Sequence, residues 1–183
     1  PISDTRLYAS AGRAYRAPSL LERYQPDVAF GNQLFQANPD LEPEEVLAFD
    51  SGIEQRLGAP CTLRLAGFYN DMNNLIAVRQ AGPVVTFENV DDAWSAGAEA
   101  SLDYSLTRTL MLTAAYTRQA TENRSTEQDL AYMPENTASI GLRARQPFRR
   151  VVIVGSLSEQ YVGTRGYVDE ATGQWESLTD YWR

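Results

Sequence analysis

Hydrophobic and polar residues alternate with a period of two along most of this chain. The clearest example runs from Trp94 to Tyr104, where Ser95, Gly97 and Glu99 separate apolar residues. Successive side chains of a strand point to opposite faces, so this period predicts β-structure and does not fit the 3.6-residue period of a helix. The apolar set of this segment is Trp94, Ala96, Ala98, Ala100, Leu102 and Tyr104.

The alternation predicts an all-β chain of about eight strands, each about ten residues long. That length is what a tilted strand needs to cross the hydrocarbon core of a bilayer. The predicted strands are 5–15, 46–57, 62–71, 94–104, 110–117, 138–145 and 151–161, with a further strand beginning at 178–182.

The predicted strands are joined by short and long connections in turn. This alternation is typical of an antiparallel transmembrane β-barrel, which has short periplasmic turns and long extracellular loops. We therefore expect a fragment of such a barrel. Tight turns are predicted at 58–60, 105–108 and 146–149, a loop of medium length at 78–92, and long loops at 14–45, 119–135 and 163–177.

A second architecture stays open at this point. A secreted or surface β-sandwich that binds a carbohydrate or another ligand without transport also has alternating strands and aromatic loops. It does not explain why every second connection is long, since hairpins of soluble proteins usually close in two to five residues.

The loop at 14–45 is the most distinctive of the long connections. Pro18 cannot donate to a strand ladder, so strand pairing is expected to stop there. Ser19 and Glu22 have the spacing of a capping box, which predicts a short helical turn through about Tyr24. Two later prolines, Pro39 and Pro43, stiffen the return.

Hydropathy and charge narrow the class of protein. The mean hydropathy of −0.39 is compatible with a barrel, because only alternate residues of its strands face lipid. The first residues have neither a basic nor an apolar region, so an exported protein would be a longer precursor of which this is a piece. The net charge of −8 disfavours nucleic acid as a partner.

Catalytic and cofactor chemistry finds little support in the composition. The 183 residues include no His, which removes Ser-His-Asp and Cys-His catalysis and the commonest zinc ligand. The single Cys61 cannot form an internal disulfide. We expect no enzyme activity, no cofactor and no metal. A calcium ion at Asp91–Asp92 or Asp169–Glu170 stays open, although these pairs lack the spacing of a helix-loop-helix calcium loop.

Several short motifs resemble those of one family when taken in order. The segments Ala-Tyr-Arg-Ala-Pro-Ser-Leu at 14–20 and Asn-Pro-Asp-Leu-Glu-Pro-Glu at 38–44 resemble the paired signature in the barrel of TonB-dependent outer-membrane receptors. Further matching segments are Gly-Phe-Tyr-Asn-Asp at 67–71, Phe-Glu-Asn-Val at 87–90, Gly-Ala-Glu-Ala at 97–100, Tyr-Met-Pro-Glu-Asn at 132–136 and Tyr-Val-Gly-Thr-Arg at 161–165.

The resemblance implies a function and a location. Receptors of this family bind a ferric siderophore, cobalamin or a similar scarce ligand at their extracellular loops, and they import it across the Gram-negative outer membrane with energy delivered by TonB. It also implies that 1–183 is a partial barrel domain in contact with outer-membrane lipid. The plug domain, through which TonB acts, and the closing strands would lie outside it.

Residues of the long loops are the candidates for contact with the ligand. Aromatic surfaces and amide groups can hold a large polar ligand, and arginines can meet an anionic one. Each of them also has a simpler role, which is to pack its loop or to pair with a nearby carboxylate. The candidates are Tyr24, Asn32, Gln33, Phe35, Asn38, Arg79, Arg124 and Tyr167, with Arg165 as a further loop arginine.

Overall fold

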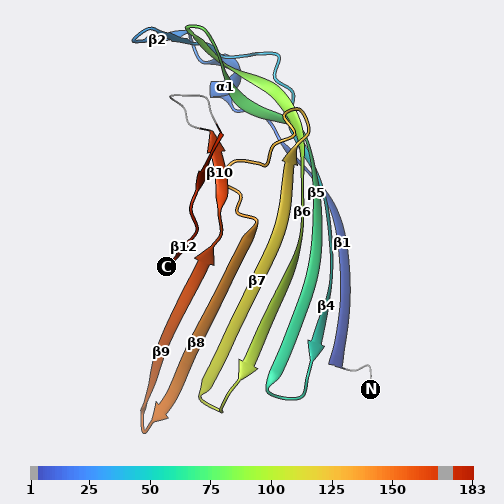
Figure 1. The fold of residues 1–183 in the computed structure, drawn as a ribbon, viewed down its shortest axis with the longest axis vertical. Helices are drawn as coiled ribbons and strands as arrows, with labels where there is room; N and C mark the ends of the chain where they lie inside the picture. Colours follow the sequence, from blue (N-terminus) through green and yellow to red (C-terminus); the bar gives the residue numbers. More distant parts are fainter. Residues whose placement is uncertain (1–3, 169–174) are drawn as a thin grey trace.

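One antiparallel sheet forms most of the molecule (Figure 1). The computed structural model describes residues 4–168 and 175–183. In these residues each long strand pairs with the next one along the chain, so the sheet is a meander. Its order is β1 (Thr5–Arg16), β4 (Glu44–Arg56), β5 (Cys61–Ala81), β6 (Val84–Ser105), β7 (Leu110–Asn123), β8 (Asn136–Phe148), β9 (Val151–Val162) and β12 (Tyr181–Trp182).

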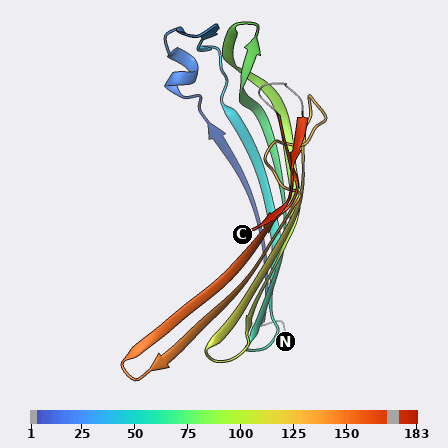
Figure 2. The same ribbon diagram turned by 60° about the vertical axis from the view of Figure 1, so that its left-hand side comes forward.

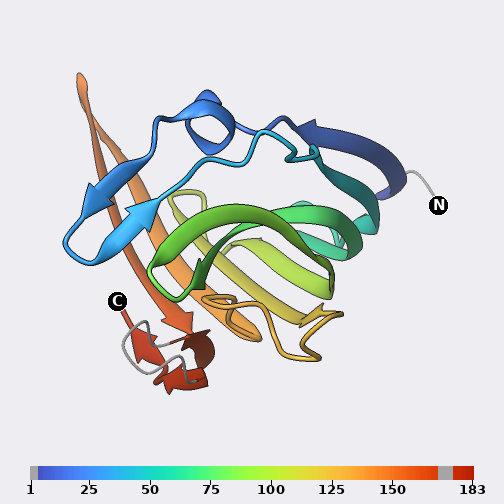
Figure 3. The ribbon, with the colours of Figure 1, turned by 90° about the horizontal axis from the view of Figure 1, so that it is seen from above.

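The sheet is curved, and its strands bend along their length (Figure 2). Seen from above, the strands follow an arc from β1 to β9 (Figure 3). The long strands belong to this one sheet and not to two layers packed face to face, as a sandwich would require. No helix in the described part of the chain is long and apolar enough to cross a bilayer.

One face of the sheet, which we call the apolar face, is defined by the register row Leu7, Ile53, Leu65, Ala100 and Tyr116. Its large side chains are exposed, with 75% of the surface of Leu7 and 70% of that of Leu157 accessible. No large side chain is fully buried among the described residues. Since apolar surface is normally removed from water on folding, this face needs an apolar environment outside the chain.

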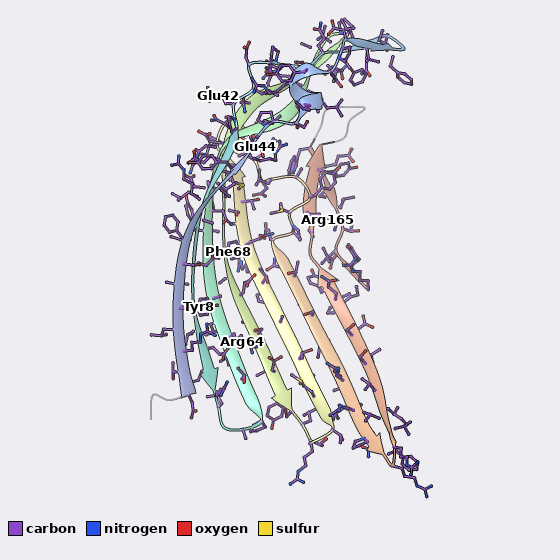
Figure 4. All side chains as sticks on the ribbon, turned by 180° about the vertical axis from the view of Figure 1, so that it is seen from behind. Tyr8, Glu42, Glu44, Arg64, Phe68 and Arg165 are labelled. Atoms are coloured by element: carbon purple, nitrogen blue, oxygen red, sulfur yellow. The ribbon has the colours of Figure 1, made fainter. Side chains whose placement is uncertain are left out.

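The opposite face, which we call the polar face, is defined by Tyr8 on β1 and Glu99 on β6 together with the residues in register with them. On it Arg64 forms ion pairs with Glu54 at 2.9 Å and with Asp103 at 2.6 Å, which links β4, β5 and β6. Figure 4 labels Arg64 together with Tyr8 and Phe68 of the same face. The predicted alternation is therefore realised as an apolar face and a polar face.

Smaller elements lie at one end of the sheet, opposite the tight turns (Figure 1). They are α1 (Leu20–Tyr24), β2 (Val28–Phe30), β3 (Gln33–Phe35), β10 (Arg165–Val168) and β11 (Trp175–Leu178). The predicted helical turn and its capping box are confirmed: the Glu22 N–H donates to Ser19 Oγ, and the Ser19 N–H donates to the Glu22 carboxylate. β3 pairs in parallel with the start of β6.

The predicted loop at 78–92 is wrong. β5 continues to Ala81, β6 begins at Val84, and the two form a hairpin that extends beyond the neighbouring strands. Gly82 lies in the tight turn that joins β5 to β6 and has a φ of +61°, a conformation that glycine adopts without strain. The segment mixes polar residues with β-branched ones, so its pattern did not predict strands. In the structure β3 pairs with Val84 and Val85, and this pairing cannot be read from the spacing of residues in the sequence.

Other boundaries differ by a few residues. β7 runs to Asn123, into the segment predicted as a loop, and β8 runs to Phe148, so that the turn before β9 is Arg149–Arg150. The predicted long loop at 163–177 contains β10 and β11, which pair with each other. In each case hairpin pairing extends further than the apolar pattern.

We predict that a methyl group at Gly97 hinders assembly of the sheet. A Cβ there would lie 2.5 Å from the Phe68 ring and 2.6 Å from the carbonyl oxygen of Arg118. Overpacking of this kind costs about 1–3 kcal/mol. Gly97→Ala in the whole protein is expected to lower the fraction of heat-resistant, fast-migrating folded barrel on electrophoresis. Gly67→Ala is the control, because Gly67 lies on β5, which is paired on both sides, and a Cβ there meets only the carbonyl oxygen of Gly97 at an ordinary 3.7 Å. Equal folding of both variants would contradict the prediction.

Candidate ligand-binding loops

The loop between β1 and β4 is fastened at its base by three charged residues, which we call the loop-base cluster: Arg16, Glu22 and Glu44. The Arg16 guanidinium donates two hydrogen bonds to Glu44, at 2.5 and 2.7 Å, and its Nη1 shares a bifurcated bond with the two oxygens of Glu22, at 3.2 and 3.5 Å. Glu44 also accepts the N–H of Ile76 at 2.9 Å. A bidentate pair of this kind is stronger and more directional than a simple ion contact.

The cluster changes the acidity of its carboxyl groups. The hydrogen bond from Arg16 holds the pKa of Glu44 below its usual value, and the bond from the Ile76 N–H adds to this. The pKa of Glu22 is lowered mainly by the Ser19 N–H, with Arg16 contributing less. Both groups are therefore stabilised in their charged form by the folded loop.

The return of the same loop is held on β6 by side-chain amides. Asn38 donates from Nδ2 to the carbonyl of Phe87 at 2.9 Å, and its own N–H donates to the carbonyl of Glu22 at 2.8 Å. Asn89 receives the N–H of Glu42 at 2.8 Å and donates to the carbonyl of Glu42 at 3.0 Å. Asn38 thus has a structural role in this structure, and its contact with a ligand stays a prediction.

The other predicted residues of this loop lie on α1 and on the small β2–β3 hairpin. Tyr24 ends α1 and is exposed, with the Arg23 guanidinium 5.2 Å from its ring centre. Asn32 is exposed in the turn between β2 and β3, whereas Gln33 and Phe35 are half-buried on β3. The structure brings Asn32, Gln33 and Phe35 into one hairpin beside the β5–β6 tip, whereas Tyr24 lies on α1.

The remaining candidates come from three other connections at the same end of the sheet. Arg79 on β5 pairs with Glu88 at 3.5 Å, and Arg124 after β7 pairs with Asp71 at 2.5 Å. Tyr167 on β10 donates from its hydroxyl to Glu176 at 2.7 Å. These residues come from three separate connections at the loop end of the sheet, and each has a carboxylate partner.

A hollow of about 420 Å³ lies between the β7–β8 loop and the segment that follows β9. Arg165 lines it, and Figure 4 labels this residue at the loop end of the sheet. Trp175, Asp129 and Glu135 line it as well and were absent from the predicted set. The spacing of residues in the sequence does not predict these three residues, because the walls of the hollow come from two loops that are far apart in the sequence.

A second hollow, of about 540 Å³, opens on the polar face and is lined by Tyr8, Asp50, Phe68 and Glu99 among others. The Tyr8 ring crosses Gly52, and the Phe68 ring crosses Gly97, so small residues on neighbouring strands make room for aromatic ones. This hollow combines the carboxylates of Asp50 and Glu99 with two aromatic rings.

The alternative calcium sites gain no support. No group of three His, Cys, Asp or Glu residues that could hold a metal is present in residues 4–168 and 175–183, apart from side chains that the structure leaves undescribed. The side chain of Asp91 and the pair Asp169–Glu170 lie outside the described residues.

Comparison with known proteins identifies the family. The family model described as "TonB dependent receptor-like, beta-barrel" matches residues 1–183. The chain belongs to this family. TonB-dependent receptor barrels are proteins of the outer membrane, as the sequence motifs predict. An iron-regulated outer membrane virulence protein of Vibrio cholerae serotype O1 is 31% identical over 127 residues, which are 61% of this chain and 19% of that relative.

Solved TonB-dependent receptor structures share the fold of the chain. The siderophore receptor PirA from Acinetobacter baumannii superposes with a TM-score of 0.75 at 16% identity, over 97% of this chain and 31% of that one. The copper transporter OprC gives a TM-score of 0.73 at 19% identity, over 97% and 28%. At these identities the likeness concerns the fold alone. The chain therefore spans about a fifth to a third of the relatives it matches.

We predict that Arg16→Gln loosens the β1–β4 loop without unfolding the sheet. The change removes the two bonds to Glu44 and the bond to Glu22. Chymotrypsin is expected to cut the loop of the intact receptor on whole cells several times faster, at Tyr24 or Phe30. Arg13→Gln is the control, because Arg13 pairs with Glu45 on the other face of the sheet. Equal cutting of the two variants would show that the cluster does not fasten the loop.

The same cluster predicts a dependence on acid. Both carboxyl pKa values are lowered from 4.5, so their stabilising effect is present above pH 4.5 and is lost as the pH falls through the lowered values. Pepsin should cut the loop of wild-type receptor more slowly than that of Arg16→Gln above pH 4.5, and the difference should shrink progressively as the pH is lowered below 4.5. A difference that does not change with pH in this acid range would contradict the assignment.

Proposed function

We propose that this chain is part of the transport barrel of a receptor that binds a ferric siderophore at its outer loops and imports it with energy from TonB. The observation that carries the proposal is the pairing of a whole-chain family match with a two-faced sheet. The apolar face would contact lipid. The polar face would line the interior, and the loop end would face outwards.

The architecture supports this arrangement on physical grounds. In a bilayer every backbone N–H and C=O needs a partner, so a sheet can span it only when its edges are closed. β1 and β12 lie at the two edges of the meander. Further strands of the whole receptor would pair with them, and the tight turns would lie on the periplasmic side.

The choice of an iron complex as cargo rests on the relatives. The curated relative is named as iron-regulated, and one structural neighbour is named as a siderophore receptor. Another neighbour is named as a copper transporter, so the fold by itself does not select the cargo. Cobalamin is the alternative cargo that the sequence motifs left open.

The proposed contact surface consists of the exposed polar and aromatic groups of the loop end. The β2–β3 hairpin and α1 offer Tyr24, Asn32 and Gln33, and the other connections offer Arg79 and Arg124. Both arginines are paired in this structure, so an anionic ligand would have to compete with their carboxylate partners. The proposed plug would occupy the polar face, where the hollow beside Tyr8 and Phe68 could receive it.

The test is uptake by the whole receptor in its native membrane. Cells that lack the gene should lose uptake of radioactive iron from at least one ferric siderophore of a panel, and the whole gene should restore it. Restoration should fail in a strain without TonB. Cyanocobalamin and copper uptake serve as controls and should not change. Loss of cobalamin or copper uptake, with uptake from every siderophore unchanged, would contradict the proposed cargo.

A further inference from the structure

Two outer loops meet at the hollow of about 420 Å³ beside β10, and the contact between them is specific. The N–H of Tyr132 donates to the carbonyl of Gly166 at 2.7 Å, and the rings of Tyr132 and Tyr167 are 6.2 Å apart. In the lining of the same hollow the N–H of Gly163 donates to the carbonyl of Asn136 at 2.8 Å. The walls of the hollow are therefore held by hydrogen bonds between the loops.

A guanidinium with unused hydrogen-bonding capacity lies in this hollow. The Arg165 guanidinium carbon is 5.1 Å from the ring centre of Tyr181, a contact that fixes the orientation of the charged group. Its Nη1 atom is buried and has no hydrogen-bond partner among the residues that the structure describes. A buried charged donor without an acceptor is costly, so an acceptor is expected to arrive from outside the described residues.

Negative charge is present in the same hollow but does not satisfy Arg165. Asp129 and Glu135 both line it, and neither is a partner of Arg165 Nη1. Both carboxylates are exposed residues of the β7–β8 loop, whereas Arg165 belongs to β10. The hollow thus presents a cation on one wall and two carboxylates on the other.

This separation of charge selects the chemistry of an occupant. A simple anion would be attracted by Arg165 but repelled by the two carboxylates. A simple cation would be attracted by the carboxylates but repelled by Arg165. A group that carries both signs a few ångströms apart complements both walls. Trp175, whose indole lies against Gly166, adds an apolar surface to the lining of the hollow.

We propose that this hollow binds a zwitterionic, amino-acid-like group, with its carboxylate on Arg165 and its ammonium group at Asp129 and Glu135. Within the proposed function, on which this rests, the group would be a peptidic portion of the imported ligand. A volume of about 420 Å³ is within the range of small-molecule pockets and exceeds what one ion needs.

The test uses the purified whole receptor in detergent and glycylglycine as the probe. Ligand-observed saturation-transfer NMR at millimolar peptide should show binding to the wild type. N-acetylglycylglycine, which lacks the ammonium group, and glycylglycine amide, which lacks the carboxylate, should each bind at least about tenfold more weakly, because a charge-assisted hydrogen bond is lost.

Variants separate the two walls. Arg165→Gln should weaken glycylglycine binding about tenfold and leave the weak binding of glycylglycine amide unchanged. Glu135→Gln should likewise weaken glycylglycine binding and leave the weak binding of N-acetylglycylglycine unchanged. Arg150→Gln, in the tight turn at the other end of the sheet, is the control and should bind as the wild type does. Circular dichroism of each variant checks folding.

The outcomes distinguish this proposal from the proposed function. No binding of glycylglycine, or binding that survives both blocking groups and Arg165→Gln, overturns the zwitterion site even if siderophore uptake is found. Glycylglycine binding with the expected losses supports the site even if the imported cargo proves not to be a ferric siderophore.

Discussion

The pairing of backbone groups within one continuous sheet is the constraint on which the rest of this structure depends. Seven long strands pair in sequence order, and this register places apolar side chains on one face and polar ones on the other. With no large side chain fully buried in the described residues, the apolar face cannot be a core of this chain. A lipid environment on that face and a polar interior on the other satisfy both halves of the pattern.

The loop end follows from the same sheet. β5 and β6 extend beyond their neighbours, and β3 pairs with the extended part of β6. The loop-base cluster of Arg16, Glu22 and Glu44 fixes the point where the β1–β4 loop leaves the sheet. Leu41, only 4% exposed, lies in the return of this loop. The loops are therefore built on the strand ends, which gives a large irregular surface a defined position.

Local chemistry explains which features the sequence reveals. The alternation from Trp94 to Tyr104 and the capping box of Ser19 and Glu22 depend on neighbouring residues, so both are readable without the fold. The β5–β6 extension depends on pairing with β3, and the hollow at Arg165 depends on two loops that meet only in space. Asn38 shows the same limit, because its amide partner is a carbonyl 49 residues away.

The most direct measurement of the central claim is the lipid exposure of consecutive residues in one strand. In the whole receptor with Cys61→Ser, spin labels at each position from Leu112 to Thr117 in β7 would be tested for collision with oxygen and with a water-soluble nickel complex in bilayers. The account predicts high oxygen accessibility at Leu112, Ala114 and Tyr116 and low accessibility at Thr113, Ala115 and Thr117. Accessibility without a period of two, or with the two sets exchanged, would contradict it.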